Sequence, residues 1–137
     1  MKKINCILLV DDNYVDNALR KIRIRKVDIC NHIAIAIDGY EALNYIIKSG
    51  DPNQSGKFPK PDLIYLDINM PRMNGFEFLT EYHKLDETLK SKVVIIMLSS
   101  SLDPDDKTKA LGFKEVTEFQ NKPLTNAGLR KTLDKYF

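Results

Sequence analysis

Short apolar runs recur along the chain, separated by stretches whose apolar residues recur at helical spacing. Within these runs both alternating positions are apolar, which is typical of strands buried on both faces of a sheet. The pattern predicts strands over 4–10, 33–37, 63–66, 93–98 and 116–119. The last run is the weakest of them and would suit a strand at the edge of a sheet.

Helical periodicity predicts a helix after each strand. The expected helices cover 13–27, 41–48, 75–90, 103–112 and a C-terminal segment that carries Leu129, Leu133 and Tyr136. The first of them offers an apolar face made of Val15, Ala18, Leu19 and Ile22. Strand–helix alternation repeated five times predicts a doubly wound parallel α/β sheet with five helices. The segment 49–61 is rich in Pro and Gly and is interpreted as an exposed insertion before the third strand.

Length and composition narrow the class of protein. The 137 residues suit one domain over 1–137, without an output domain. Lys and Arg number 21 against 19 Asp and Glu, and a net charge of +2 argues against direct nucleic-acid binding. The longest aliphatic run, 93–98, is far too short for a membrane helix, and no secretion signal opens the chain, so we expect a cytoplasmic protein. Cys6 and Cys30 are interpreted as small core residues.

Polar side chains stand at the carboxyl ends of four predicted strands, where open parallel sheets place their ligand sites. In chain order these side chains are Asp11, Asp12, Asp67, Ser99 and Lys122. Each has an ordinary explanation as a helix cap or turn residue. Their joint occurrence at the same end of neighbouring strands instead predicts one shared site with three carboxylates, a hydroxyl and an ammonium group.

Three crowded carboxylates disfavour one another's ionisation unless a cation compensates them. Oxygen ligands without His or Cys favour a hard divalent ion, and we expect Mg²⁺. Together with Lys122 and Ser99, such an ion would form a clamp for a phosphoryl group. Asp67 is then the candidate nucleophile, forming an acyl phosphate.

The residues Leu66-Asp67-Ile68-Asn69-Met70-Pro71-Arg72-Met73-Asn74-Gly75 resemble the phosphorylation-site loop of two-component response-regulator receiver domains. The acidic pair in Leu9-Val10-Asp11-Asp12-Asn13, the hydroxyl of Ser99 and the pair Lys122-Pro123 also match that family's pattern. The resemblance covers the whole chain. It implies a flavodoxin-like sheet with strand order 2-1-3-4-5.

The resemblance also implies a role for each site residue. Asp67 would be the phosphoacceptor, while Ser99 and Lys122 would contact the phosphoryl oxygens. Mg²⁺ would be held by Asp12, Asp67 and the backbone carbonyl of Asn69, with Asp11 acting largely through water. Phe119 would be the aromatic switch residue, and the Lys122–Pro123 peptide bond would be cis.

The function implied is that of a response regulator phosphorylated by a sensor histidine kinase or a phosphotransfer protein. Phosphorylation would repack the face formed by the predicted fourth helix, fifth strand and fifth helix. That face would act on an unknown downstream protein or form a phosphorylation-dependent homodimer. The 49–61 segment and the pair Asp12-Asn13 resemble single-domain receivers that partner bacterial phytochrome kinases.

Two other functions share part of this pattern. A haloacid-dehalogenase-like aspartyl phosphatase uses the same groups, but it places a second acid two residues after the nucleophile, where this chain has Asn69. Its acidic metal pair also follows the nucleophile, whereas Asp11 and Asp12 precede Asp67. A flavin-binding flavodoxin-like module would need a Ser/Thr/Gly loop in place of 11–13. We therefore expect a signalling protein rather than a turnover enzyme.

Overall fold

The sheet of the computed structural model, which describes residues 3–100 and 103–137, has five parallel strands in the order β2-β1-β3-β4-β5. The strands are β1 (Ile4–Val10), β2 (Cys30–Ala36), β3 (Leu63–Asp67), β4 (Val94–Ser99) and β5 (Val116–Asn121). The doubly wound sheet and its strand order are thus confirmed, and β5 lies at an edge as predicted. The second strand begins three residues earlier than its apolar run indicated, because Cys30 and His32 pair with β1.

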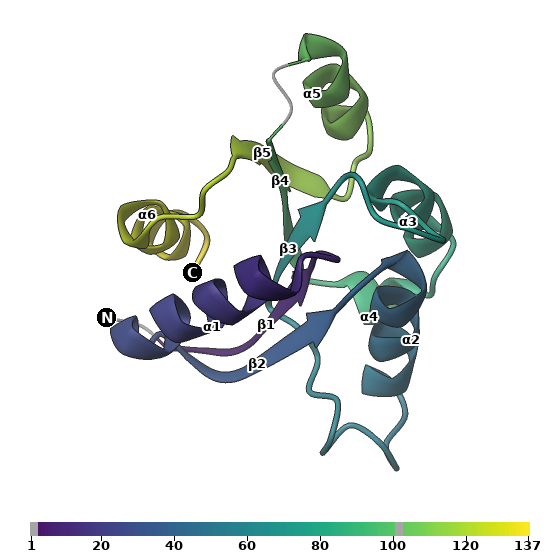
Figure 1. Ribbon diagram of the computed structural model, residues 1–137. Helices are drawn as coiled ribbons and strands as arrows, with labels where there is room; N and C mark the ends of the chain where they lie inside the picture. Colours follow the sequence, from purple (N-terminus) through teal and green to yellow (C-terminus); the bar gives the residue numbers. More distant parts are fainter. Residues whose placement is uncertain (1–2, 101–102) are drawn as a thin grey trace.

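Helices cover both faces of this sheet (Figure 1). They are α1 (Tyr14–Val27), α2 (Gly39–Ser49), α3 (Gly75–His83), α4 (Glu87–Lys90), α5 (Pro104–Leu111) and α6 (Asn126–Tyr136). α1 and α6 pack on one face, and α2, α3 and α5 pack on the other. Alternate strand residues therefore enter two separate apolar cores, which explains why the runs are apolar at both positions. Among the described helices, none is long and apolar enough to cross a bilayer.

The continuous helix predicted over 75–90 is wrong, because the segment forms two helices. α3 ends at His83, and Asp86 starts α4 by accepting a hydrogen bond from the backbone N–H of Thr88. The Lys90 ammonium donates back to the carbonyl of His83 over 2.8 Å. Leu85 packs against the core between the two helices, so a tertiary contact breaks the helix where the local sequence does not.

The apolar face expected for the first helix is exposed. Val15, Leu19 and Ile22 keep 63%, 50% and 52% of their surface in solvent. The buried side of α1 instead carries Asn17, Arg20 and Ile24. Two of these three side chains are polar, and they point toward the end of the sheet at which Asp11 lies.

The 49–61 segment is only partly exposed, contrary to its interpretation as an exposed insertion. Phe58 packs edge-on against Tyr45, and the Tyr45 hydroxyl donates to the carbonyl of Pro59 over 2.7 Å. The Lys60 ammonium donates to two backbone carbonyls, those of Thr88 and Ser91. These contacts join the segment to α2 and α4.

Candidate functional site

Strand register brings the predicted acidic residues to one edge of the sheet. Val10 lies beside Leu66, and Asp67 lies beside Leu98, so β1, β3 and β4 end at nearly the same level. Carboxylate oxygens of the three acids at this edge lie within 4.8 Å of one another; the acids are Asp11, Asp12 and Asp67. Asp11 and Asp67 are buried, whereas Asp12 is exposed.

Lys122 follows β5 and reaches across to the acids. Its ammonium lies 3.0 Å from Asp11 Oδ2 and 3.2 Å from Asp67 Oδ1. The backbone N–H of Lys122 donates to the carbonyl of Ser99, and the peptide bond from Lys122 to Pro123 is cis. Burial alone would lower the pKa of Lys122, but the two carboxylates outweigh it and raise that pKa. Lys122 therefore stays charged beside Asp67.

Asp11 is almost fully buried and its carboxylate is heavily engaged. Oδ2 accepts from Lys122 and from the Arg20 guanidinium at 2.8 Å, and Oδ1 accepts from the backbone N–H of Asn13 at 2.9 Å. The Asn17 side chain donates to the Asp11 carbonyl over 2.7 Å. Burial pushes the pKa of Asp11 up, yet these donors together hold it below its usual value.

Sequence reasoning missed Arg20 and Asn17. Both stand on the face of α1 opposite the apolar face that periodicity singles out. The available signal was their spacing with Ile24, because positions 17, 20 and 24 form one face of a helix.

The pKa of Asp67 is shifted in the opposite direction from that of Asp11. Burial and the nearby charge of Asp11 raise the pKa of Asp67, and its contact with Lys122 offsets only part of this. The carboxylate of Asp67 is thus less satisfied than that of Asp11. A poorly compensated carboxylate at a strand end suits a group that reacts with an incoming electrophile.

The loop after β3 is held close to Asp67. A Cβ added at Gly75 would lie 2.3 Å from the carbonyl oxygen of Asp67, so only glycine fits this approach. Asn74 and Glu77 form a capping box at the start of α3. Arg72 has a positive φ of 63°, and its guanidinium donates to the buried carboxylate of Asp38 at 2.7 Å. These contacts fix the backbone next to Asn69.

Two further predicted site residues lie near this edge. Ser99 is the last residue of β4 and is buried. Phe119 lies on β5, is half-buried, and packs against the apolar core under α5. Ser99 and Phe119 therefore lie on neighbouring strands of the sheet, close to each other.

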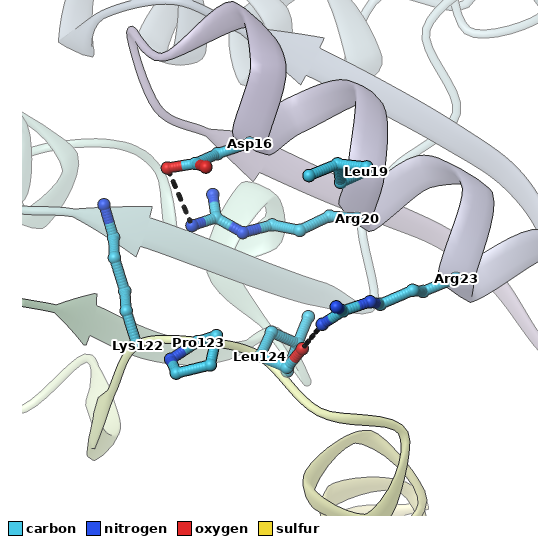
Figure 2. A pocket seen from close by; sticks show the side chains of 7 residues that line it. All are labelled: Asp16, Leu19, Arg20, Arg23, Lys122, Pro123 and Leu124. Carbon is cyan, nitrogen blue, oxygen red and sulfur yellow. Dashed lines mark hydrogen bonds and ion pairs between the residues drawn. The ribbon is translucent and has the colours of Figure 1, made fainter.

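A groove of about 300 Å³ borders the acidic cluster, between α1 and the residues that follow β5 (Figure 2). Its lining consists of Asp16, Leu19, Arg20, Arg23, Lys122, Pro123 and Leu124. The Arg23 guanidinium donates to the Leu124 carbonyl over 2.6 Å and joins the two walls. Arg20 and Lys122 enter the site from opposite walls of this groove.

The donor set of the acidic cluster fits a hard divalent cation. All of its clustered ligand atoms are carboxylate oxygens, the ligands that Mg²⁺ and Mn²⁺ accept in proteins. The cluster is also open to solvent on the side of Asp12, which suits an ion that keeps several waters.

Comparison with known proteins identifies the family that shares this site. Residues 7–134 match the model of the response regulator receiver domain. This chain belongs to that family. The family accepts a phosphoryl group on aspartate in two-component signalling, and the resemblance found in the sequence is confirmed. The aspartyl phosphatase alternative is not favoured.

Individual relatives agree with this assignment. The response regulator Rcp1 of Synechocystis is 33% identical over 100 residues, which span 73% of this chain and 65% of that protein. A solved two-component response regulator of Cytophaga hutchinsonii superposes with a TM-score of 0.83 at 33% identity and covers 98% of both chains. The phosphorylated cyanobacterial phytochrome response regulator RcpA gives a TM-score of 0.74 at 28% identity, over 98% of this chain and 91% of that one.

Proposed function

We propose that Asp67 accepts a phosphoryl group from a phosphohistidine of a sensor histidine kinase or a phosphotransfer protein. One oxygen of the Asp67 carboxylate forms the new P–O bond, the P–N bond to the donor imidazole breaks, and the imidazole leaves with the bonding pair. The observation that carries this proposal is the position of Asp67, a buried strand-end carboxylate 3.2 Å from the Lys122 ammonium in an acidic cluster.

Catalysis of such a transfer is mainly positioning and charge compensation. We propose that Asp11, Asp12, Asp67 and the Asn69 carbonyl would hold Mg²⁺, which would supply positive charge to the phosphoryl oxygens. Lys122 supplies a further positive charge, because its ammonium already contacts Asp67.

We propose a conformational switch that starts at Ser99 and Lys122. Phosphoryl oxygens on Asp67 attract the Ser99 hydroxyl and draw Lys122 away from Asp11, since a phosphoryl group is a stronger anionic partner. Movement of Ser99 at the end of β4 makes room for Phe119, which lies on the neighbouring strand. The face formed by α5, β5 and α6 is repacked, and a downstream protein or a second copy of the chain recognises it.

The exposed face of α1 is suited to contact the phosphodonor protein. Val15, Leu19 and Ile22 are apolar and at least half exposed. Leu19 also lines the groove that leads to Lys122. A donor protein that buries this face would bring its phosphohistidine to the edge where Asp67 lies, and apolar burial would supply affinity.

Acetyl phosphate with Mg²⁺ tests the acceptor assignment. Intact-mass measurement should show one added phosphoryl group on the wild-type protein and none on Asp67→Asn, because an amide cannot form the acyl phosphate. Asp28→Asn is the matched control, since that carboxylate is exposed and pairs with Lys3, and it should be labelled like the wild type. Undiminished labelling of Asp67→Asn would place the acceptor elsewhere.

A further inference from the structure

Arg20 is an unexpected cation at the acidic cluster. Its side chain is only 9% exposed, and its guanidinium donates to Asp11 Oδ2 at 2.8 Å. Asp11 Oδ2 also accepts from Lys122, and Oδ1 accepts from the Asn13 N–H. A carboxylate offers about four lone-pair positions, so most of the capacity of Asp11 is already taken by protein donors.

The second cation also changes the charge of the cluster. Three carboxylates opposed by Lys122 alone would leave two net negative charges, and Arg20 reduces this to one. A divalent cation near Asp11 would be repelled by a guanidinium bound to the same carboxylate. Arg20 therefore opposes cation binding through its charge and because it occupies an oxygen of Asp11 that would otherwise bind the cation or one of its waters.

Arg20 has a second carboxylate within reach. Its Nη2 lies 3.9 Å from Asp16 Oδ2, one helical turn earlier on α1. Asp16 lines the groove and is not one of the three clustered acids, and Figure 2 shows the guanidinium directed toward it. The Asp16 side chain is 39% exposed, so it can shift to meet the guanidinium at low cost.

We propose that Arg20 is a resident counter-ion of Asp11, which competes with the divalent cation for that carboxylate and turns to Asp16 when the cation binds. This inference rests on the proposed function, because it concerns the same site. Arg20 acts here as a positioning residue that sets the cation affinity. The groove beside α1 supplies the space for its movement.

Titration with Mn²⁺, read from the loss of the electron paramagnetic resonance signal of the free ion, tests this competition without any measurement of activity. Arg20→Met should lower the Kd for Mn²⁺ roughly tenfold, because a charge-assisted hydrogen bond to Asp11 no longer has to be broken. Competition with Mg²⁺ should show the same shift. Arg20→Gln, which is neutral but still polar, should shift the Kd in the same direction and serves if the Met variant folds poorly.

Arg23→Met is the matched control. Arg23 stands on the same helix and lines the same groove, but it donates to a backbone carbonyl. Its removal should leave the Kd unchanged within about twofold, since its charge is not bonded to the cluster. An equal fall in Kd for Arg23→Met would reduce the effect to overall charge and overturn the proposal.

Asp16→Asn tests the second position of Arg20. It should raise the Kd for Mn²⁺ a few-fold in the wild-type background and have no effect in Arg20→Met, because the two side chains act through one contact. An unchanged or raised Kd in Arg20→Met would overturn the proposal. If that result appears while Asp67 is still labelled by acetyl phosphate, the proposed function stands and only the role of Arg20 fails.

Discussion

Replacing Asp67 with asparagine should stabilise the fold, although the change removes a salt bridge. At an effective dielectric constant of about 20, the attraction between Lys122 and Asp67 at 3.2 Å amounts to about 5 kcal/mol. Repulsion from Asp11, within 4.8 Å, amounts to at least about 3.5 kcal/mol. Asp12 is exposed and adds roughly half as much, because water screens it. The Coulomb contributions therefore nearly cancel.

The desolvation of the Asp67 carboxylate then decides whether Asp67→Asn raises or lowers the free energy of unfolding. The Asp67 side chain is only 11% exposed, so its charge loses most of its hydration on folding, whereas a neutral amide loses much less. We expect Asp67→Asn to raise the free energy of unfolding by about 1 kcal/mol and the melting temperature by roughly 3 °C. Urea unfolding followed by circular dichroism, with a chelator present, measures this at neutral pH.

The pH dependence of this stability gain tests whether the buried charge of Asp67 causes it. The pKa of Asp67 is raised in the folded state by burial and by Asp11. The ionised carboxylate therefore opposes folding above that pKa, and this opposition disappears as the pH falls through the folded pKa toward the unfolded one. The advantage of Asp67→Asn should be greatest at neutral pH and shrink on acidification.

Asp11→Asn should have the opposite effect. The pKa of Asp11 is lowered in the folded state, so its stabilisation is present above the unfolded pKa and is lost as the pH falls through the folded pKa. Losing this carboxylate removes the acceptor that Arg20 and Lys122 share, and a turn of Arg20 toward Asp16 recovers only part of the loss, so the change costs roughly 2 kcal/mol. Destabilisation by Asp67→Asn, or stabilisation by Asp11→Asn, would refute this electrostatic reasoning.

Two further changes test the packing around the site. Gly75→Ala should destabilise the protein by roughly 2 kcal/mol or more and slow labelling by acetyl phosphate, because the added Cβ would lie 2.3 Å from the Asp67 carbonyl oxygen. A variant with the labelling rate and melting temperature of the wild type would contradict this. Ile24→Ala should cost roughly 2–4 kcal/mol, whereas Leu19→Ala on the same helix should stay within about 0.5 kcal/mol, as thermal unfolding can show. Equal losses for these two variants would mean that the orientation of α1 is wrong.

The sheet could be predicted from the sequence because its strands are buried on both faces. Runs such as 63–66 and 93–98 have no polar position, so they fit few other structures in a chain of this size. The gathering of Asp67 and Lys122 at one edge then follows from parallel topology, since every strand ends there.

The break between α3 and α4 could not be predicted in this way. Residues 84–86 are compatible with a helix, and what ends it is the packing of Leu85 and the bond from Lys90 to the His83 carbonyl. The first is a tertiary contact, and the second forms only once the chain has turned between the two helices. The partial burial of Phe58 within a segment that composition marks as a loop has the same origin, because its partner Tyr45 belongs to α2.

The orientation of α1 is the main error of the sequence reasoning, and its cause is functional. Asp11 lies three residues before this helix, and its buried carboxylate and carbonyl accept hydrogen bonds from the inward face of α1 in addition to those from Lys122 and the Asn13 N–H. Asn17 and Arg20 occupy that face together with Ile24 and leave Val15, Leu19 and Ile22 outside. An exposed apolar face contributes little to the stability of a free monomer. Its burial against a partner protein would contribute favourably to the free energy of binding. The inward face of α1 thus organises the acidic cluster, and the outward face, beside the groove to Lys122, is the surface that the proposed contact with a phosphodonor protein would bury.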